Sequence, residues 1–383
     1  MIVSHKSYTF ILLLLSLLIA GGTSLPTTIG VTYNPSTIHI SPERVVDALE
    51  SMKIPAIRLI SPSPAAIRAF AYSSISLLLC VPNDLVHFFA ANRTSAQVWL
   101  YSHVVPFYPR AKISAISVGM DVFSAAADLS DDIMPAINNL YKSLVELGIR
   151  HISVSTTLSF VNVISGAFPP STADFQEPMA GVIIKPLLDF LRETNSSFMV
   201  NLYPYTVYKL NSDLPIGYAI FQEARFNFRD DTFTGVRYHN LFDSMVDSVI
   251  GAMAQAGYED IPVTVTETGW PSGASGMEAD ATEVYAEKYI RGLIEHLHSG
   301  QGTPLRKEGV AETYIFELFD EDNVQQGSGI AGQKWGILYE NMTKKFHFDL
   351  SSSEAEFPGW RLGFFCLWLL LFFYCFASRY HSP

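Results

Sequence analysis

The chain has 383 residues, 49% of them hydrophobic, so it can bury a large core and has an ordinary length for one α/β barrel. Its 37 acidic residues outnumber its 25 basic residues and give a formal net charge of −12. This charge argues against nucleic acid as a partner, because binding phosphates requires a basic surface. A chain with this net negative charge is better suited to an uncharged or cationic partner.

The first 24 residues have the pattern of a secretory signal peptide. His5 and Lys6 precede an apolar run over residues 10–20, and small residues follow at a candidate cleavage site. We therefore expect the mature chain to begin near Leu25. Asn-X-Ser/Thr sites, which fit passage through a glycosylating compartment, occur at Asn92, Asn195 and Asn341.

From residue 25 to residue 350, strand-like and helix-like segments alternate, which predicts βα units and a parallel sheet. We expect strands over residues 28–33, 56–60, 76–81, 113–118, 152–156, 198–202, 261–267 and 313–319. We expect one helix that begins at residue 41. We expect further helices over residues 64–71, 83–104, 133–147, 179–193, 239–256 and 279–298. Eight such units without a linker predict a single (β/α)8 TIM barrel over residues 25–350.

A doubly wound open sheet is the alternative fold. That fold usually carries a glycine-rich phosphate loop after its first strand. Residues 34–40, which follow the first expected strand, contain no glycine. The sequence therefore favours the barrel.

The C-terminal segment, residues 351–383, predicts a membrane anchor. Residues 362–377 are almost wholly apolar, and a polar spacer separates them from the small residues 351–353. This layout is typical of a signal for a glycosylphosphatidylinositol (GPI) anchor, whose hydrophobic tail is removed. A single membrane-spanning helix is the alternative. Either anchor places the domain outside the cell, at the plasma membrane or in the cell wall.

Cysteine usage gives the folded domain no intrachain disulfide. Cys366 and Cys375 lie in the apolar C-terminal segment, which leaves Cys80 alone in the body of the chain. Cys80 occurs in an apolar run that is expected to be a strand, so we interpret it as a buried and inert thiol.

Residues 261–275 contain the strongest candidate for catalysis, Glu267. The β-branched residues before it predict a strand, and Gly269 and Pro271 end that strand. In a barrel, functional side chains follow the C-terminal strand ends, and Asp121 ends the fourth strand as Glu267 ends the seventh. We expect these two carboxylates to lie on opposite sides of the eight-membered ring and to face each other across the mouth as the pair that glycoside hydrolysis requires.

Other residues near the strand ends are candidates for sugar binding. Aromatic rings at the mouth can stack on sugar rings, and amide and carboxylate groups can bond to sugar hydroxyls. The candidates of this kind are Tyr33, Asn201, Tyr203, Trp270, Glu312 and Glu321. Any single aromatic residue among them is also compatible with a place in the core.

Motifs for other chemistries do not occur in the sequence. The ten histidines show no HExxH or other metal-binding spacing, and there is no GxSxG elbow and no P-loop. We therefore expect no metal and no cofactor. We also expect the chain to be a monomer.

Several blocks resemble the plant endo-β-1,3-glucanases of glycoside hydrolase family 17. The most specific block is Glu-Thr-Gly-Trp-Pro-Ser at residues 267–272, and the resemblance extends over residues 29–338. The other blocks are 56–59, 81–83, 153–156, 198–205 and 316–321. The resemblance implies a retaining mechanism with Glu267 as nucleophile, Glu312 and Glu321 as supporting carboxylates, a β-1,3-glucan substrate of the callose or laminarin type, and in many members a GPI anchor.

The chain departs from this family's pattern at the acid/base position. The family has Val-Gly-Asn-Glu after the fourth strand, and this chain has Met120 and Asp121 in place of the last two residues. Aspartate withdraws the carboxyl group by roughly 1.5 Å, and a misplacement near 1 Å can lower a rate about a hundredfold. Methionine removes a hydrogen-bonding group expected near the sugar 2-hydroxyl.

Three hypotheses for function follow from these residues. The first is a cell-surface endo-β-1,3-glucanase in which Asp121 serves as the acid. The second is a catalytically impaired relative that binds β-glucan at the boundary between wall and membrane. The third is transglycosylation, because a sugar can replace water in attacking a retaining intermediate.

Overall fold

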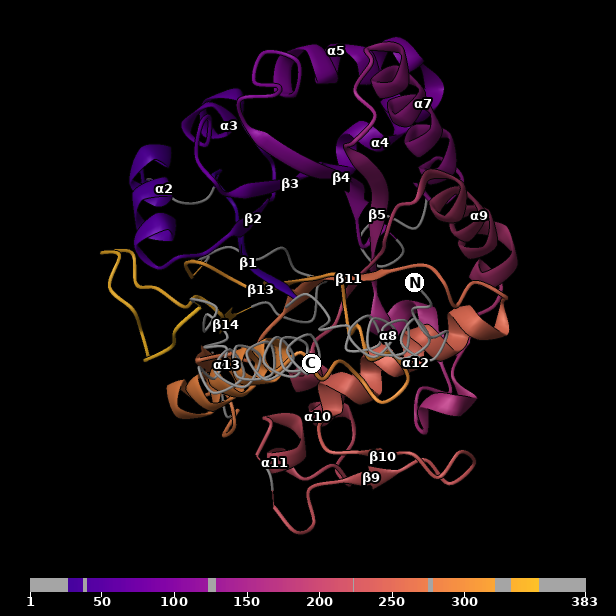
Figure 1. The fold of residues 1–383 in the computed structure, drawn as a ribbon, viewed down its shortest axis with the longest axis vertical. Helices are drawn as coiled ribbons and strands as arrows, with labels where there is room; N and C mark the ends of the chain where they lie inside the picture. The colour runs from indigo at the N-terminus through magenta and orange to yellow at the C-terminus, as the bar shows by residue number, and fades with distance from the viewer. Residues whose placement is uncertain are drawn as a thin grey trace, which may run out of the picture. The chain divides into compact units, whose positions relative to one another are not determined.

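Eight parallel strands close into a barrel, as the sequence predicts (Figure 1). The computed structural model describes residues 27–36, 40–122, 129–222, 224–274, 278–320 and 332–350. In order round the barrel, the strands are β1 (Thr28–Tyr33), β13 (Glu312–Ile315), β11 (Val263–Thr268), β8 (Phe198–Asn201), β5 (Ser153–Ser159), β4 (Lys112–Met120), β3 (Ser76–Val81) and β2 (Ala56–Leu59). Because β1 pairs with both β13 and β2, the sheet has no edge, and the open-sheet alternative is wrong.

Helices surround the strands (Figure 1). They are α2 (Pro42–Ser51), α3 (Pro64–Ala69), α4 (Asn83–Ala91), α5 (Arg93–His103), α7 (Ile133–Glu146), α8 (Phe160–Val163), α9 (Lys185–Thr194), α10 (Pro204–Leu210), α11 (Ile216–Ala219), α12 (Leu241–Gln255) and α13 (Glu283–His298). Local sequence explains several of their starts. Proline occupies the first turn of α2 and α3, and the side chains of Asn240 and Thr282 cap α12 and α13.

Two expected helices differ from the observed ones. The segment expected as one helix over 83–104 is two helices, α4 and α5, because Asn92 takes an extended conformation and its side chain caps α5 through the Thr94 N–H. The segment expected over 179–193 begins as a π-helical turn, η3 (Ala180–Ile184), which continues into α9. In both cases the apolar pattern predicts the helix but not the break within it.

The eighth strand is shorter than its apolar run. Its sequence predicts a strand over 313–319, whereas β13 ends at Ile315. Residues beyond it remain buried and form isolated contacts, including a bridge between Phe319 and Leu338. Burial thus extends past the regular sheet, and a run of apolar residues does not reveal where the strand ends.

Side chains fill the barrel and the space outside it as two apolar clusters. The inner cluster contains Ala56, Leu78, Cys80, Ala115, Met199 and Tyr314, one or two residues from each of five strands. The larger cluster lies between the strands and the helices. Alternation of side chains along each strand separates the two sets.

A long excursion follows β8 before the chain reaches α12. It contains α10, α11 and a hairpin of β9 (Arg229–Asp230) and β10 (Arg237–Tyr238). Two further small antiparallel sheets pair β6 (Ile164–Ser165) with β7 (Asp174–Phe175), and β12 (Gly273–Ala274) with β14 (Gln333–Lys334). A short 3₁₀ turn, η2 (Pro170–Thr172), precedes β7.

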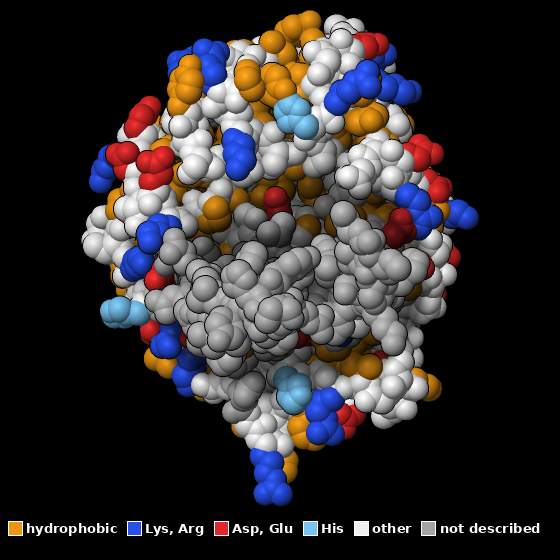
Figure 2. Space-filling view, in the orientation of Figure 1, with side chains coloured by type: hydrophobic (Ala, Val, Ile, Leu, Met, Phe, Trp, Pro, Cys, Tyr) orange, Lys and Arg blue, Asp and Glu red, His pale blue; other side chains and the backbone are white. Residues whose placement is uncertain are grey.

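The described residues belong to one compact unit that ends at Leu350. Among them, no helix has both the length and the apolar character needed to cross a bilayer. The expected signal peptide and the C-terminal anchor lie outside the described residues. The three candidate glycosylation asparagines, Asn92, Asn195 and Asn341, are all exposed. Figure 2 shows acidic and basic side chains interspersed around one face of the molecule.

Candidate active site

Glu267 points into the mouth of the barrel because β11 departs from regular alternation just before it. Thr266 faces the interior, where its hydroxyl donates to the side-chain oxygen of Asn201 at 2.8 Å. Regular alternation would turn the next residue outward. The pairing of β11 with β8 shifts between Val265 and Glu267, which is the irregularity of a β-bulge. As a result, Glu267 lines a cavity at this mouth and is only 7% exposed.

Two side chains hold the carboxylate of Glu267. Arg58, which is fully buried on β2, forms an ion pair with one carboxylate oxygen. The hydroxyl of Tyr203, just beyond β8, donates to the other oxygen. Both bonds fix the orientation of the carboxylate, and the guanidinium balances its charge.

These two partners keep their protons. Burial alone would lower the pKa of Arg58, but the neighbouring Cys80 and Glu267 raise it overall. Burial, and then the charge of Glu267, raise the pKa of Tyr203 well above its ordinary value. Burial also raises the pKa of the Cys80 thiol to about 11. Arg58 therefore remains a cation, Tyr203 remains a donor, and Cys80 is the inert thiol that its sequence context predicts.

Asp121 lines the same cavity as Glu267. It follows β4 in a left-handed conformation with φ of 46°, just after Gly119 at φ of 72°. Its N–H donates to the Thr157 carbonyl at 2.9 Å, and the Asn162 amide donates to its carboxylate at 3.3 Å. The cavity has a volume of about 60 Å³ and is lined by Asp121, Ser159, Phe160, Val161, Asn201, Tyr203, Thr206 and Glu267.

The two carboxylates come from strands that are not diametrically opposite. Round the barrel, β11 and β4 are separated by β8 and β5, so they stand three positions apart. The sequence predicts opposite sides of the ring. The difference arises because the strand count places them at the fourth and seventh positions, one short of the diameter.

The main chain of Met120 is held by the side chain of Asn83. The amide nitrogen of Asn83 donates to the Met120 carbonyl at 2.9 Å, and the Met120 N–H donates to the Asn83 oxygen at 2.7 Å. The Met120 side chain packs against the inner apolar cluster. The backbone that leads to Asp121 is thus fixed without help from the side chain at position 120.

Among the candidate sugar-binding residues, Asn201 and Tyr203 lie in the cavity beside Glu267 and Asp121. Tyr33 and Trp270 do not line the cavity. Tyr33 is 2% exposed and packs edge-on against Phe319, and burial raises the pKa of Tyr33 to about 12. Trp270 is 1% exposed, and its indole N–H donates to the Asp280 carbonyl at 2.8 Å.

Glu312 lies away from the cavity. It is the first residue of β13 and pairs in register with Thr28, the first residue of β1. Since parallel strands start at the same end of a barrel, Glu312 is at the end opposite to Glu267. Its carboxylate accepts a hydrogen bond from Tyr314 at 2.7 Å. This position does not support the predicted role of Glu312 in substrate binding. Glu321 lies outside the described residues.

Sequence reasoning missed Arg58 as a member of the site. A signal exists, because Arg58 is the one charged residue in the otherwise apolar strand β2. A charge at such a position requires a buried partner. The lining residues Ser159, Phe160, Val161 and Thr206 carry no comparable signal. Among the described residues, no group of three or more histidine, cysteine or acidic side chains could hold a metal ion.

The matching family is Glycosyl hydrolases family 17, over residues 29–350. The chain belongs to this family. A glucan endo-1,3-beta-glucosidase 2 from Arabidopsis thaliana is 37% identical over 317 residues, which are 82% of this chain and 62% of that protein. Lichenase-2 from Hordeum vulgare is 35% identical over 316 residues, 82% of this chain and 96% of that protein.

A solved structure of a similar protein has the same fold. It is CJP38, a beta-1,3-glucanase and allergen of Cryptomeria japonica pollen, with a TM-score of 0.78 and 32% identity. The match covers 85% of this chain and 99% of that one. By contrast, the chain spans only 61% to 65% of the length of the Arabidopsis glucan endo-1,3-beta-glucosidases 12, 2 and 13.

Proposed function

We propose that this protein is an endo-acting hydrolase of β-1,3-glucan that works with retention of configuration. The observation that carries this proposal is that Glu267, held by Arg58 and Tyr203, shares one cavity with a second carboxylate, Asp121. The names of its relatives, glucan endo-1,3-beta-glucosidases and a beta-1,3-glucanase, support the choice of substrate.

In the first step, Glu267 attacks the anomeric carbon while Asp121 donates its proton to the departing glycosidic oxygen. A covalent bond from Glu267 to the sugar forms as the glycosidic bond breaks. In the second step, Asp121 takes a proton from water, and the resulting hydroxide oxygen displaces Glu267. Arg58 and Tyr203 keep Glu267 in place through both steps, while Asn201 and Tyr203 contact the sugar in the cavity.

The test is release of reducing sugar from laminarin by the purified protein and by Glu267→Gln. Glutamine keeps the shape of the side chain but cannot form the glycosyl ester as a carboxylate does. We expect activity in the natural protein and a loss of at least about a thousandfold in the variant. Equal rates for the two proteins would refute the proposal.

A second candidate function is binding of β-glucan without efficient cleavage. The observation that favours it is the shorter carboxylate at position 121, next to a methionine that packs into the inner apolar cluster. Calorimetry with a soluble β-1,3-glucan tests this function. Measurable affinity without release of reducing sugar supports the binding role, and undetectable affinity rejects it.

The proposed setting is the cell surface. It is supported by the leader and tail patterns of the sequence and by the exposure of Asn92, Asn195 and Asn341. A GPI-anchored protein is released from membranes by a phospholipase that cuts the lipid, whereas a protein with a spanning helix remains in the membrane. Recovery of the chain in the cytosol, without glycans, would contradict this setting.

A further inference from the structure

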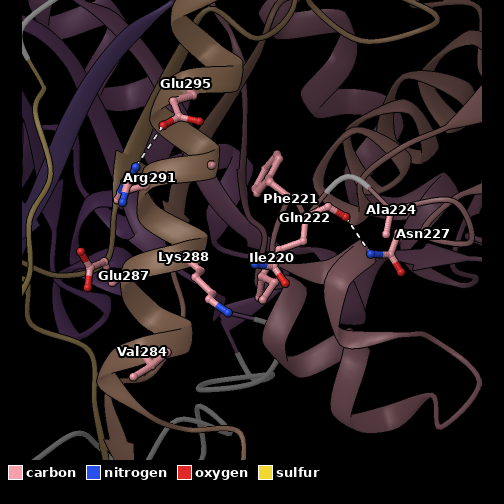
Figure 3. Close-up of a pocket in the computed structure, with 11 residues that line it drawn as sticks. Ile220, Phe221, Gln222, Ala224, Asn227, Val284, Glu287, Lys288, Arg291 and Glu295 are labelled. Atoms are coloured by element: carbon pink, nitrogen blue, oxygen red, sulfur yellow. Dashed lines mark hydrogen bonds and ion pairs between the residues drawn. The ribbon is translucent and has the colours of Figure 1, made fainter.

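A groove far larger than the cavity at the carboxylates lies on the outer wall of the barrel. It runs between helix α13 and the segment that follows α11 (Figure 3). Its volume is about 650 Å³, compared with about 60 Å³ for the cavity that contains Glu267. A volume of this size falls in the range of ligand-binding pockets. Neither Glu267 nor Asp121 lines this groove, so the mechanism leaves it without a role.

The two walls of the groove are held together by a close contact. A Cβ atom on Gly292 of α13 would lie 2.4 Å from the Cβ of Phe221, so glycine at this position allows the second wall to approach the helix. Phe221 itself has a left-handed backbone with φ of 57°. Its ring packs against Phe242 and Tyr289, with centroid distances of 6.1 and 5.6 Å. The groove is therefore preformed.

Among the described residues that line the groove, the charges balance, which favours a neutral ligand. Two cationic side chains, Lys288 and Arg291, offset two anionic ones, Glu287 and Glu295. Figure 3 shows Lys288 extending from α13 toward the opposite wall. A phosphate or carboxylate ligand would meet as many negative as positive groups, and its binding would gain little from the field of the groove.

The other lining groups suit a ligand rich in hydroxyl groups. Gln222 and Asn227 supply amides, and the Asn227 amide also donates to the Gln222 carbonyl at 2.7 Å, which orders this wall. Among the described residues, the side chains of Gln222 and Glu287 form no hydrogen bond and so remain available. Val284, which is exposed, supplies apolar surface for the C–H face of a sugar ring.

One end of the groove lies at the end of the barrel that contains Glu267. In a βα unit the helix returns antiparallel to its strand, so the first turns of α13 lie at the C-terminal end of the barrel. Val284, Glu287 and Lys288 occupy these first two turns. A polymer that lies along this part of α13 therefore has one end at the same end of the barrel as Glu267.

We propose that this groove is a second binding site for a neutral polysaccharide and, resting on the function proposed above, that it holds another part of the β-glucan being cleaved. One long chain that occupies both sites binds more tightly than either site alone, because the second contact is intramolecular. A chain too short to reach both sites gains nothing. The groove thus makes the enzyme favour long glucans.

The first test measures binding in the absence of cleavage. The protein carrying Glu267→Gln is mixed with insoluble β-1,3-glucan, and the fraction that sediments is measured with and without Gln222→Ala and Lys288→Ala. We expect the two added changes to weaken binding about tenfold. A matched control carries Gln301→Ala and Lys142→Ala, which are exposed residues outside the groove, and should bind as before.

Equal binding of the groove variant and the control would overturn the proposal, and so would an absence of sedimentation in all proteins. Unfolding midpoints that agree between the variants show that binding, and not folding, has changed. If the double variant unfolds, Glu287→Ala alone provides the same comparison.

The second test separates the groove from the active site by chain length. In the protein with Glu267 intact, the groove changes should leave kcat/KM on a short β-1,3-oligosaccharide within about twofold and should raise KM on long glucan about tenfold. An equal loss on both substrates would overturn the proposal. If the natural protein cleaves neither substrate, the proposed hydrolase function is wrong. The sedimentation test still shows whether the groove binds glucan.

Discussion

Arg58 on β2 reaches across the interior of the barrel to form an ion pair with Glu267 on β11. The Arg58 side chain is fully buried, and its Nε and Nη2 atoms have no hydrogen-bond partner among the described residues. The ion pair with Glu267 is thus the main interaction that offsets the desolvation of the Arg58 guanidinium. The orientation of Glu267 and the stability of the fold therefore depend on the same contact.

Replacement of Arg58 by methionine should lower both activity and stability. A buried carboxylate left without its partner destabilises a fold by about 3 to 5 kcal/mol, and loss of its orientation should lower kcat at least about a hundredfold. Urea unfolding and the laminarin assay measure the two effects. Arg58→Lys is the control, since it keeps the charge but not the planar fork, and should recover more stability than activity. A fully active Arg58→Met protein would contradict this role.

Replacement of Tyr203 by phenylalanine should lower kcat about tenfold, because it removes one charge-assisted hydrogen bond to Glu267. Because the pKa of Tyr203 is well above its ordinary value, the hydroxyl stays protonated, and the shape of the pH–rate profile should not change. Tyr205→Phe is a matched control, since the Tyr205 hydroxyl donates to Glu278 instead. Equal rates in both variants would show that the bond to Glu267 does not contribute.

The double change Met120→Asn with Asp121→Glu should raise turnover of laminarin at least about tenfold, because it advances the acid by about one bond length and adds a donor beside it. Asn83 holds the main chain at position 120 in either case, so the fold should tolerate the change. The single variants Met120→Asn and Asp121→Glu show how much each substitution contributes to the change in turnover. Unchanged turnover in the double variant would show that the cavity is adapted to aspartate.

Asp247 on α12 should make stability depend on pH. It is fully buried, and burial raises its pKa to about 7, although hydrogen bonds from Thr303 and the Leu305 N–H oppose the rise. The neighbouring Asp243 raises it further. The folded state therefore favours the protonated acid, whose pKa in the unfolded chain is about 3.9. Its contribution to stability is full below about pH 4 and is lost as pH rises toward 7.

Asp247→Asn removes this dependence. At pH 8 the variant should be more stable than the natural protein by a few kcal/mol, and at pH 4 the two should differ little. Urea unfolding across this range measures the effect. Asp213→Asn, at an exposed position, reports the change expected from charge alone. Parallel stability curves for the natural protein and Asp247→Asn would disprove the assignment.

Glu312→Gln should leave kcat/KM within about twofold, because the residue starts β13 at the end of the barrel remote from Glu267. Its carboxylate meets Tyr314 of the inner cluster, so the change should appear in stability instead, at about 1 kcal/mol. Loss of activity without loss of stability would show that Glu312 does take part in substrate binding.

The sequence predicts the barrel and the strand ends that carry its two carboxylates because both depend on local patterns. Alternating β-branched residues define β11, and the glycine and proline after it mark where the strand ends. Strand ends in a parallel barrel then meet at one mouth whatever the details of packing. Asn201 and Tyr203 follow from the same rule, since they lie at the end of β8.

The directions of individual side chains are not predictable in this way. The bulge that turns Glu267 inward depends on how β11 pairs with β8, and the sequence of β11 alone does not specify that register. Trp270 lies past the strand end, where alternation no longer applies, and it packs against Tyr205 and Tyr208 instead of facing the cavity. Arg58 enters the site only because three-dimensional closure brings β2 within reach of β11.

The two hydrogen bonds between the Asn83 side chain and the Met120 main chain have an evolutionary consequence. The loop that presents Asp121 takes its shape from position 83, so position 120 is free to vary in chemistry without a change in backbone. Substitutions at 120 therefore change the polarity of the residue that precedes Asp121 while the backbone stays constant. Selection can therefore change the side chain at position 120 without other substitutions. The same position is a suitable starting point for directed evolution of specificity.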